Sequence, residues 1–438
     1  MSGPVVTDGP PDPALSLGIL GAHVDGAARD ILVAGGIIAA VLPAGEGAAR
    51  LPASARRIDG RRRAALPGLM NAHTHTAMAM LRGYADDMPL LPWLREKIWP
   101  LEARLVEEDV YWGARLGCLE MIRTGTTFFN DMYWHFHATA RAAADSGLRA
   151  LVGGVIIDQN DPKRAAAQRE MALAAVESVE RYGPRVRASL SPHAIYTVGE
   201  GSLRWVAETA TTRGLPVHIH LSETAREVAD CIAAHGMRPP AWLDHVGLLN
   251  EGLFAAHCVH LDAADIALLA ERGAHPLHNP VSNLKLASGG PMPYRALRQA
   301  GVRALIGTDG AASNNNLDLL EELKFAALMA KHATGDPTAM TAGDALSMAT
   351  TDAAAAFGID GGRIAPGAVA DLILVDLDHP LMFPGHDLAA DLVYAAHGRA
   401  VRTTICDGRV LMDDGHIPDE ELIRAEVRAR LNRLLADA

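Results

Sequence analysis

The sequence predicts an α/β protein with a distorted (β/α)8 barrel of the TIM type and a small β-sandwich domain built from both chain ends. Strand and helix patterns alternate through residues 67–358. Polar residues stand where the apolar strands of this region end, and strand-rich patterns lie on both sides of it. Alternation of this kind indicates a parallel sheet covered by helices, and roughly 250 residues are typical of a barrel.

The chain ends predict the small domain. Residues 1–14 are rich in proline, glycine and aspartate, and we expect them to be disordered. Residues 15–66 contain short apolar runs separated by glycine pairs, a pattern of hairpins. Strand patterns return after residue 358, at 371–375, 401–405 and 409–411, and residues 420–438 form a terminal helix. Because neither end is large enough to fold alone, we expect 15–66 and 359–438 to form one β domain.

The middle of the chain predicts the barrel, residues 67–358, element by element. The expected helices are 109–124, 165–182, 201–213, 263–271, 317–334 and 341–357; the expected strands are 126–130, 149–157, 186–191, 217–221, 253–257, 275–278 and 302–307. An open, doubly wound sheet usually carries a glycine-rich phosphate turn after a strand, and the sequence contains no GxGxxG or GxxxxGK[ST] pattern. The closed barrel is therefore favoured.

Composition limits the class of partner. The formal charge is −12, with 52 acidic and 40 basic residues, which argues against nucleic acid because such binding rests on clustered lysine and arginine. No stretch reaches the roughly 20 apolar residues of a membrane span. The four cysteines are far apart and predict neither a disulfide framework nor a thiolate metal site. We expect a cytoplasmic protein with a small-molecule substrate, no nucleic acid and no membrane.

Five residues at the ends of apolar runs predict one metal site. His73 and His75 are two positions apart, so on a strand they share a face. His220, His257 and Asp309 each end a later run. A catalytic zinc site keeps about three or four protein ligands and leaves a place for water, which His73, His75, His220 and Asp309 would satisfy. Any one of these histidines alone is more often a hydrogen-bonded core residue, and His218 is expected to be one.

Four strings of sequence carry a resemblance to a known family. They are Pro67-Gly68-Leu69-Met70-Asn71-Ala72-His73-Thr74-His75, His220-Leu221-Ser222-Glu223-Thr224, Ala256-His257-Cys258-Val259-His260 and Gly307-Thr308-Asp309-Gly310-Ala311-Ala312-Ser313-Asn314-Asn315. They resemble the amidohydrolase superfamily, and within it the methylthioadenosine/S-adenosylhomocysteine deaminases. The resemblance extends from about residue 30 to about residue 417.

The resemblance implies an activity and a cofactor. The activity is hydrolytic deamination of a 5′-modified adenosine to the inosine analogue and ammonia, with methylthioadenosine, adenosine, 5′-deoxyadenosine and S-adenosylhomocysteine as candidate substrates. Where two-metal relatives carry a bridging lysine, this chain has His193. We therefore expect one divalent ion per chain, with zinc the expected metal. Barrels of this type commonly pair, so a homo-oligomer, a dimer or tetramer, is also expected.

The resemblance also implies roles for individual residues. Glu223 donates a proton to N1 of the adenine, Asp309 passes a proton from the attacking water to the amino group, and His257 orients the nucleophile. Glu102 accepts the ribose hydroxyls and His193 contacts the purine ring. Arg164, a further candidate substrate contact, would bind a homocysteine carboxylate, although the chain has Gly153-Gly154 where some relatives carry an arginine.

Two alternatives stay open. The same fold and metal could serve an enzyme acting on another amino-heterocycle, of the s-triazine, guanine or pterin type, because function depends on the site and not on the scaffold. A catalytically silent binding protein is the other alternative. Glu102 and His193 favour a nucleoside, since a triazine has no ribose to bind, and the full set of metal ligands favours an enzyme.

Overall fold

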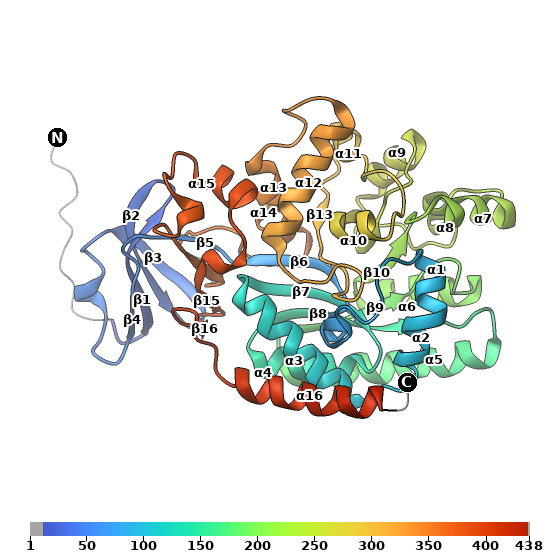
Figure 1. Cartoon of the computed structure of the whole chain (residues 1–438), viewed down its shortest axis with the longest axis horizontal. Coiled ribbons are helices and arrows are strands. Elements are labelled where there is room, and N and C mark those ends of the chain that lie inside the picture. The colour runs from blue at the N-terminus through green and yellow to red at the C-terminus, as the bar shows by residue number, and fades with distance from the viewer. Residues whose placement is uncertain (1–11, 437–438) are drawn as a thin grey trace.

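The computed structural model describes residues 12–436 and contains a parallel barrel with a separate mixed sheet (Figure 1). In the barrel, neighbouring strands follow one another in sequence order. They are β6 (Leu69–Thr74), β7 (Thr126–Tyr133), β8 (Arg149–Ile156), β9 (Val186–Pro192), β10 (Val217–Leu221), β11 (Leu253–His257), β12 (His275–His278) and β13 (Leu305–Ile306). The backbone N–H of Asp309 donates to the carbonyl of His73 at 3.0 Å, which links the last strand to the first. The predicted barrel is confirmed.

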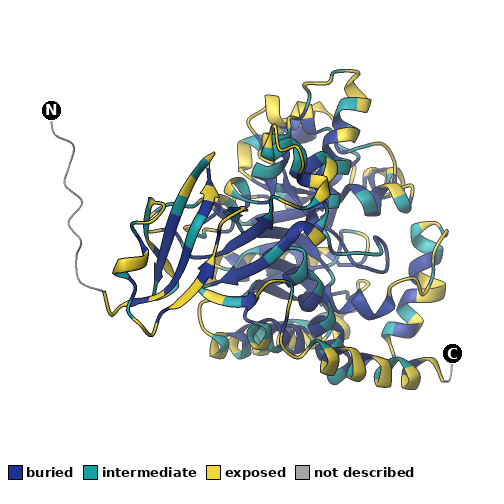
Figure 2. Ribbon diagram, turned by 60° about the vertical axis from the view of Figure 1, so that its left-hand side comes forward, coloured by how far each residue is buried: buried dark blue, intermediate teal, exposed yellow. Residues whose placement is uncertain are grey.

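The barrel strands are buried on both faces, as strands of parallel sheets are. Every residue of β6, β7, β10 and β11 is buried. Figure 2 shows the strands as a buried centre with the exposed residues on the surrounding helices and loops. Polar side chains such as His73 and His220 stand among these buried residues and are therefore shielded from solvent.

Helices cover the outside of the barrel. The longer ones are α3 (Glu107–Arg123), α4 (Phe136–Ser146), α5 (Pro162–Val179), α6 (Glu200–Arg213), α7 (Ala225–His235), α9 (Ala263–Arg272) and α12 (Leu319–Thr334). The shorter ones are α1 (Leu90–Pro92), α2 (Trp99–Glu102), α8 (Pro239–His245), α10 (Pro280–Lys285), α11 (Tyr294–Gln299), α13 (Ala342–Met348), α14 (Thr351–Ala356) and α15 (Leu388–Ala390). The ranges predicted from sequence match α3, α5, α6, α9 and α12 closely, whereas α4, α7 and α8 were not predicted.

The helix predicted over residues 341–357 is divided into α13 and α14. The carbonyl of Ala349 accepts a hydrogen bond from the backbone N–H of Met70 in β6 at 2.8 Å. A carbonyl that faces the barrel strand is turned away from the helix axis, so the helix stops and starts again after Thr350. The strand predicted over residues 302–307 is likewise reduced to the two residues of β13.

Both ends of the chain contribute to the second sheet. Its order is β16-β15-β14-β5-β1-β2-β3, with β4 beside β1. The strands are β1 (Leu15–Val24), β2 (Ala27–Ala34), β3 (Ile37–Pro43), β4 (Arg56–Asp59), β5 (Arg63–Pro67), β14 (Leu372–Asp376), β15 (Val401–Cys406) and β16 (Arg409–Met412). The antiparallel pair β5–β14 joins the two halves, and buried side chains from β1, β2 and β14 share one core. The predicted composite β domain is confirmed as an architecture.

The exact domain boundaries stay a prediction, and the terminal helix bears on them. α16 (Glu420–Leu435) runs along the barrel helix α3 (Figure 1), where Arg433 pairs with Asp109 and Glu420 with Arg123. Residues 359–438, expected to belong to the β domain, thus include a helix that packs on the barrel.

The predicted disordered segment 1–14 lies mostly outside the described residues, since description begins at residue 12. Within residues 12–436, no helix is long and apolar enough to cross a bilayer.

Candidate active site

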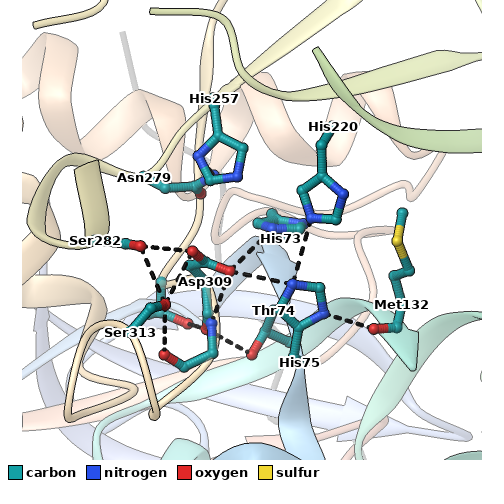
Figure 3. Close-up of polar contacts among 12 residues, drawn as sticks. His73, Thr74, His75, Met132, His220, His257, Asn279, Ser282, Asp309 and Ser313 are labelled. Atoms are coloured by element: carbon teal, nitrogen blue, oxygen red, sulfur yellow. Dashed lines mark hydrogen bonds and ion pairs between the residues drawn. The ribbon is translucent and has the colours of Figure 1, made fainter. Parts of the chain in front are cut away.

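The predicted metal ligands meet at the carboxyl ends of the barrel strands (Figure 3). His73 is in β6 and His75 follows it, His220 is in β10, and Asp309 comes three residues after β13. Barrel enzymes build their sites at this end because loops from several strands converge there. The four side chains, spread over more than half of the chain, are therefore brought together by the fold.

The distances between these side chains suit a tetrahedral metal ion. Oδ1 of Asp309 lies 3.2 Å from Nε2 of His73 and 3.2 Å from Nε2 of His75. Nε2 of His220 lies 3.4 Å from Nε2 of His75. Zinc–nitrogen bonds of 2.0–2.1 Å in a tetrahedral arrangement place ligand atoms about 3.3 Å apart. Nε2 of His73 is also buried without a hydrogen-bond partner, and a metal ion bound between these side chains would use its lone pair.

Hydrogen bonds on the far side of each ring aim the histidines inward. Nδ1 of His75 donates to the carbonyl of Met132 at 2.6 Å, and Nδ1 of His220 donates to the carbonyl of His193 at 2.7 Å. Each bond fixes the ring tautomer, which leaves the lone pair of Nε2 facing the other ligands. Nδ1 of His73 contacts Nε2 of His218 at 2.8 Å. His218 was expected to be a core residue, and it is a buried one that touches the metal site.

Asp309 is held as a carboxylate. Its Oδ2 accepts hydrogen bonds from Ser282 Oγ at 2.6 Å and Ser313 Oγ at 3.0 Å, and its Oδ1 accepts one from the backbone of Gly310 at 2.9 Å. Burial would raise the pKa of Asp309, but its contacts with the neighbouring histidine rings hold that pKa well below the usual value. The side chain is therefore ionised and available both to a metal and to a proton.

Glu223 and His257 lie beside the four ligands. Burial, with the nearby charge of Asp309, raises the pKa of Glu223 to about 8, so this side chain carries a proton at neutral pH. Nδ1 of His257 accepts from the Asn283 amide at 2.9 Å, which places the ring proton on Nε2. That Nε2 lies 3.8 Å from Oε2 of Glu223. The site thus combines one proton donor with one carboxylate that can accept a proton.

All of these groups except His73 face one pocket. The predicted substrate residues Glu102 and His193 line it. Oε2 of Glu102 accepts from Trp134 Nε1 at 3.1 Å, and Nδ1 of His193 contacts Thr197 Oγ1 at 2.9 Å. The other lining residues are His75, Met78, Leu90, Trp93, Leu94, Trp99, Met132, Tyr133, Trp134, Val155, Ile157, Tyr196, His220, Glu223, His257, Leu286, Asp309 and Ser313.

The structure does not bring Arg164 into this group. It lies in the first turn of α5, is exposed, and donates to Oε1 of Gln159 at 3.0 Å. No arginine or lysine among residues 12–436 lines the pocket. The role of Arg164 as a substrate contact stays a prediction; in this structure its side chain is directed to a neighbouring loop residue.

Sequence reasoning missed several residues that hold the site. Ser313 and Asn283 fix Asp309 and His257, and Trp134 fixes Glu102. Ser313 stands in a string that carries the family resemblance, but the resemblance assigned it no role. Trp134 gave no signal, because a tryptophan after a strand is usually part of the core.

A model of the amidohydrolase family matches residues 64–411. The chain belongs to the amidohydrolase family. A 5′-deoxyadenosine deaminase of Methanoregula boonei is 51% identical over 87% of this chain and 86% of its own length. A 5-methylthioadenosine/S-adenosylhomocysteine deaminase of Archaeoglobus fulgidus is 46% identical over 83% of this chain and 86% of its own.

Solved structures of the amidohydrolase fold agree with the architecture. An adenosine deaminase of Xanthomonas campestris with bound zinc has 39% identity and a TM-score of 0.89, covering 97% of this chain and 99% of its own. An atrazine chlorohydrolase of Arthrobacter aurescens, complexed with zinc, has a TM-score of 0.85 at 24% identity, over 94% of this chain and 99% of its own. The second likeness, at such low identity, concerns the fold alone.

Proposed function

We propose that this amidohydrolase is a metal-dependent hydrolytic deaminase that converts a 5′-modified adenosine to the inosine analogue and ammonia. The observation that carries the proposal is the arrangement of Glu223. This carboxyl group is buried and protonated at neutral pH, and it faces the same pocket as His75, His220, Asp309 and Glu102. The names of the relatives, all deaminases of adenosine analogues, support it.

One zinc ion per chain is the proposed cofactor, held by His73, His75, His220 and Asp309. A zinc ion in such a site lowers the pKa of its water to about 7 and so supplies hydroxide at neutral pH. His193 follows β9, and its Nδ1 contacts Thr197 Oγ1. A second metal ion would need a bridging ligand at this position. A histidine held in this way is not such a ligand, which supports a single-metal centre.

The side chains then divide the proton transfers. Attack at C6 of the adenine puts negative charge on N1, and Glu223 donates its proton there, as a non-ligand glutamate does in other zinc deaminases. Asp309 takes one proton of the attacking water and passes it to the amino group, which leaves as ammonia, and the second proton returns to Glu223 as the C6 carbonyl forms. His257, with its proton on Nε2, hydrogen-bonds the attacking oxygen and keeps it in place.

The pocket favours a substrate with a small, uncharged 5′ group. Glu102 is placed to accept the ribose hydroxyls, and an adjoining cavity shares Trp99, Glu102, Trp134 and Ile157 with the first. Neither cavity is lined by a lysine or arginine among residues 12–436, so neither offers a counter-charge for a carboxylate. 5′-Deoxyadenosine and methylthioadenosine are therefore the preferred substrates, and S-adenosylhomocysteine a poorer one.

An enzyme for another amino-heterocycle is the second candidate. The triazine-hydrolase and guanine-deaminase structures share the fold at 24% and 22% identity, and fold alone does not select a substrate. Glu102 distinguishes the candidates. It is a half-buried carboxyl group on the pocket wall, and a triazine or a free base has no ribose to satisfy it.

The test is ammonia release by zinc-loaded protein from 5′-deoxyadenosine, methylthioadenosine, adenosine and S-adenosylhomocysteine, compared with the Glu223→Gln variant. We expect turnover of the first two to exceed that of S-adenosylhomocysteine. Loss of the acid should lower kcat by about 100-fold to 10000-fold. The variant keeps all four ligands, so its zinc content should equal that of the wild type. Release of ammonia from guanine but from none of the four nucleosides would favour the second candidate.

A further inference from the structure

A second buried glutamate stands directly behind Glu223. Glu227 lies in the first turn of α7, is 4% exposed and does not line the pocket. Its Oε1 accepts a hydrogen bond from the backbone N–H of Ser222 at 2.8 Å, and its Oε2 accepts one from the backbone N–H of Glu223 at 2.8 Å. One carboxylate therefore binds the two peptide groups that set the direction of the Glu223 side chain.

The backbone at this point needs such support. Ser222 has a φ of +51°, a left-handed conformation that is strained for a non-glycine residue and persists only when its surroundings enforce it. On the opposite side, the carbonyl of Ser222 accepts from the N–H groups of Val259 at 3.1 Å and His260 at 2.9 Å. The turn is thus held by α7 on one side and by the loop after β11 on the other.

We propose that Glu227 is a positioning residue that holds Glu223 at the place from which it protonates the substrate. The inference rests on the proposed function for the role of Glu223, but the hydrogen bonds that carry it do not depend on the substrate. Glu227 acts through Glu223 and does not itself touch the substrate.

The chemistry of the contact requires a carboxylate. Burial raises the pKa of Glu227 to about 7, and the two backbone N–H groups oppose this rise because they favour the ionised form. An ionised glutamate is purely an acceptor, so both of its oxygens can receive an N–H. A glutamine has the same size and shape, but one of its two terminal groups is an NH2 donor. In the place of Glu227 it would direct that donor at a backbone N–H, and one buried N–H would lose its acceptor. Glu227→Gln is therefore a nearly isosteric change that releases one end of the turn.

Asp30 offers a matched control far from the pocket. It is a buried carboxylate in β2, 1% exposed, and accepts hydrogen bonds from the backbone N–H groups of Gly21, Gly45 and Gly47 at 2.8–2.9 Å. Asp30→Asn makes the same carboxylate-to-amide change against backbone donors in the small sheet. It should lower the melting temperature without changing kcat.

The experiment compares the wild type, Glu227→Gln and Asp30→Asn, all loaded with zinc. In Glu227→Gln we expect kcat to fall by about 10-fold to 100-fold, because a displacement of about 1 Å can cost a factor of 100. KM and zinc content should stay within about twofold, since no pocket residue or ligand is changed. Glu227→Asp, which keeps both acceptors on a shorter stem, should recover part of the lost kcat.

Amide hydrogen exchange of the peptide that contains Ser222 and Glu223 gives a readout that needs no substrate. Exchange in this peptide should be faster in Glu227→Gln and unchanged in Asp30→Asn. Unchanged exchange, or a kcat within twofold of the wild type, would overturn the proposal. If the wild type deaminates no nucleoside, the proposed function fails, and the exchange result still decides whether Glu227 holds the turn.

Discussion

At the scale of single residues, one histidine of the proposed metal site is oriented by a different kind of partner from the other two. His75 and His220 each donate to a backbone carbonyl, whereas Nδ1 of His73 faces the imidazole of His218. If Nε2 of His73 binds the metal, its Nδ1 carries the proton and His218 must accept through Nε2. His218 then has its own proton on Nδ1, which is buried without a partner. The orientation of His73 therefore depends on a neutral ring.

Removing that ring gives the first prediction. His218→Ala leaves all four ligands in place but takes away the acceptor that orients His73, and loss of such a partner typically costs 10-fold to 100-fold in metal affinity. Competition with a zinc-binding dye measures it. His275→Ala, which removes a histidine stacked on Phe254, is the control and should bind zinc like the wild type. Equal affinity in both variants would show that His218 only fills space.

The protonation of Glu223 gives a prediction about pH. Because burial raises its pKa to about 8, the acid form is present below that pH and is lost as the pH rises through it. The value of kcat/KM, which reports the free enzyme, should be nearly constant from neutral pH up to about 8 and then fall about tenfold per pH unit. A profile of kcat/KM against pH measures this. Activity that continued to rise well beyond pH 8 would contradict the role of Glu223 as the acid.

The same residues indicate how far sequence could predict the site. The proposed reaction chemistry rests on His73, His75, His220, Asp309 and Glu223, and such residues at strand ends give a strong pattern. The serine, asparagine and glutamate partners that hold them do not, because these residue types are common in any loop or helix. Their importance depends on which backbone or side-chain atoms the fold brings within hydrogen-bond distance.

At the scale of secondary structure, long periodic elements could be predicted and interrupted ones could not. α12 begins two residues after its predicted start and ends at the predicted residue. The break between α13 and α14 depends on a hydrogen bond from Met70, which is about 280 positions away in the sequence and invisible to local periodicity. Local pattern identified the elements, and tertiary hydrogen bonds set their ends.

The terminal helix α16 gives the prediction at this scale. Arg433 pairs with Asp109 of α3, a carboxylate with no exposed side-chain surface. Arg433→Ala should lower the free energy of unfolding by about 1–3 kcal/mol, because the buried Asp109 loses a charged donor and keeps only the Val106 N–H and the more distant Arg430. Arg424→Ala, which removes an exposed pair with Glu420 in the same helix, should cost no more than about 0.5 kcal/mol. Urea denaturation measures both, and equal costs would mean that Asp109 does not fasten α16.

At the scale of the whole molecule, the two parts are joined at the end of the barrel opposite the pocket. Arg149 at the start of β8 pairs with Asp371, just before β14, at 2.7 Å and with Asp407, in the turn after β15, at 2.6 Å. Active sites of barrels lie at the carboxyl ends of the strands, so contacts at the other end serve stability. The strand and helix patterns of the sequence predicted both parts, whereas this junction depends on residues that only the folded chain brings together. The oligomeric state and the cytoplasmic location stay predictions.

The account as a whole depends on a metal-dependent deamination, and metal removal tests it most directly. Ammonia release from 5′-deoxyadenosine should be measured in the protein as loaded with zinc, after chelation, and after zinc is returned. We predict turnover that disappears on chelation, returns with about one zinc per chain, and yields one ammonia per nucleoside consumed. No release of ammonia by protein that holds one zinc per chain, or release that survives complete removal of the metal, would contradict the account.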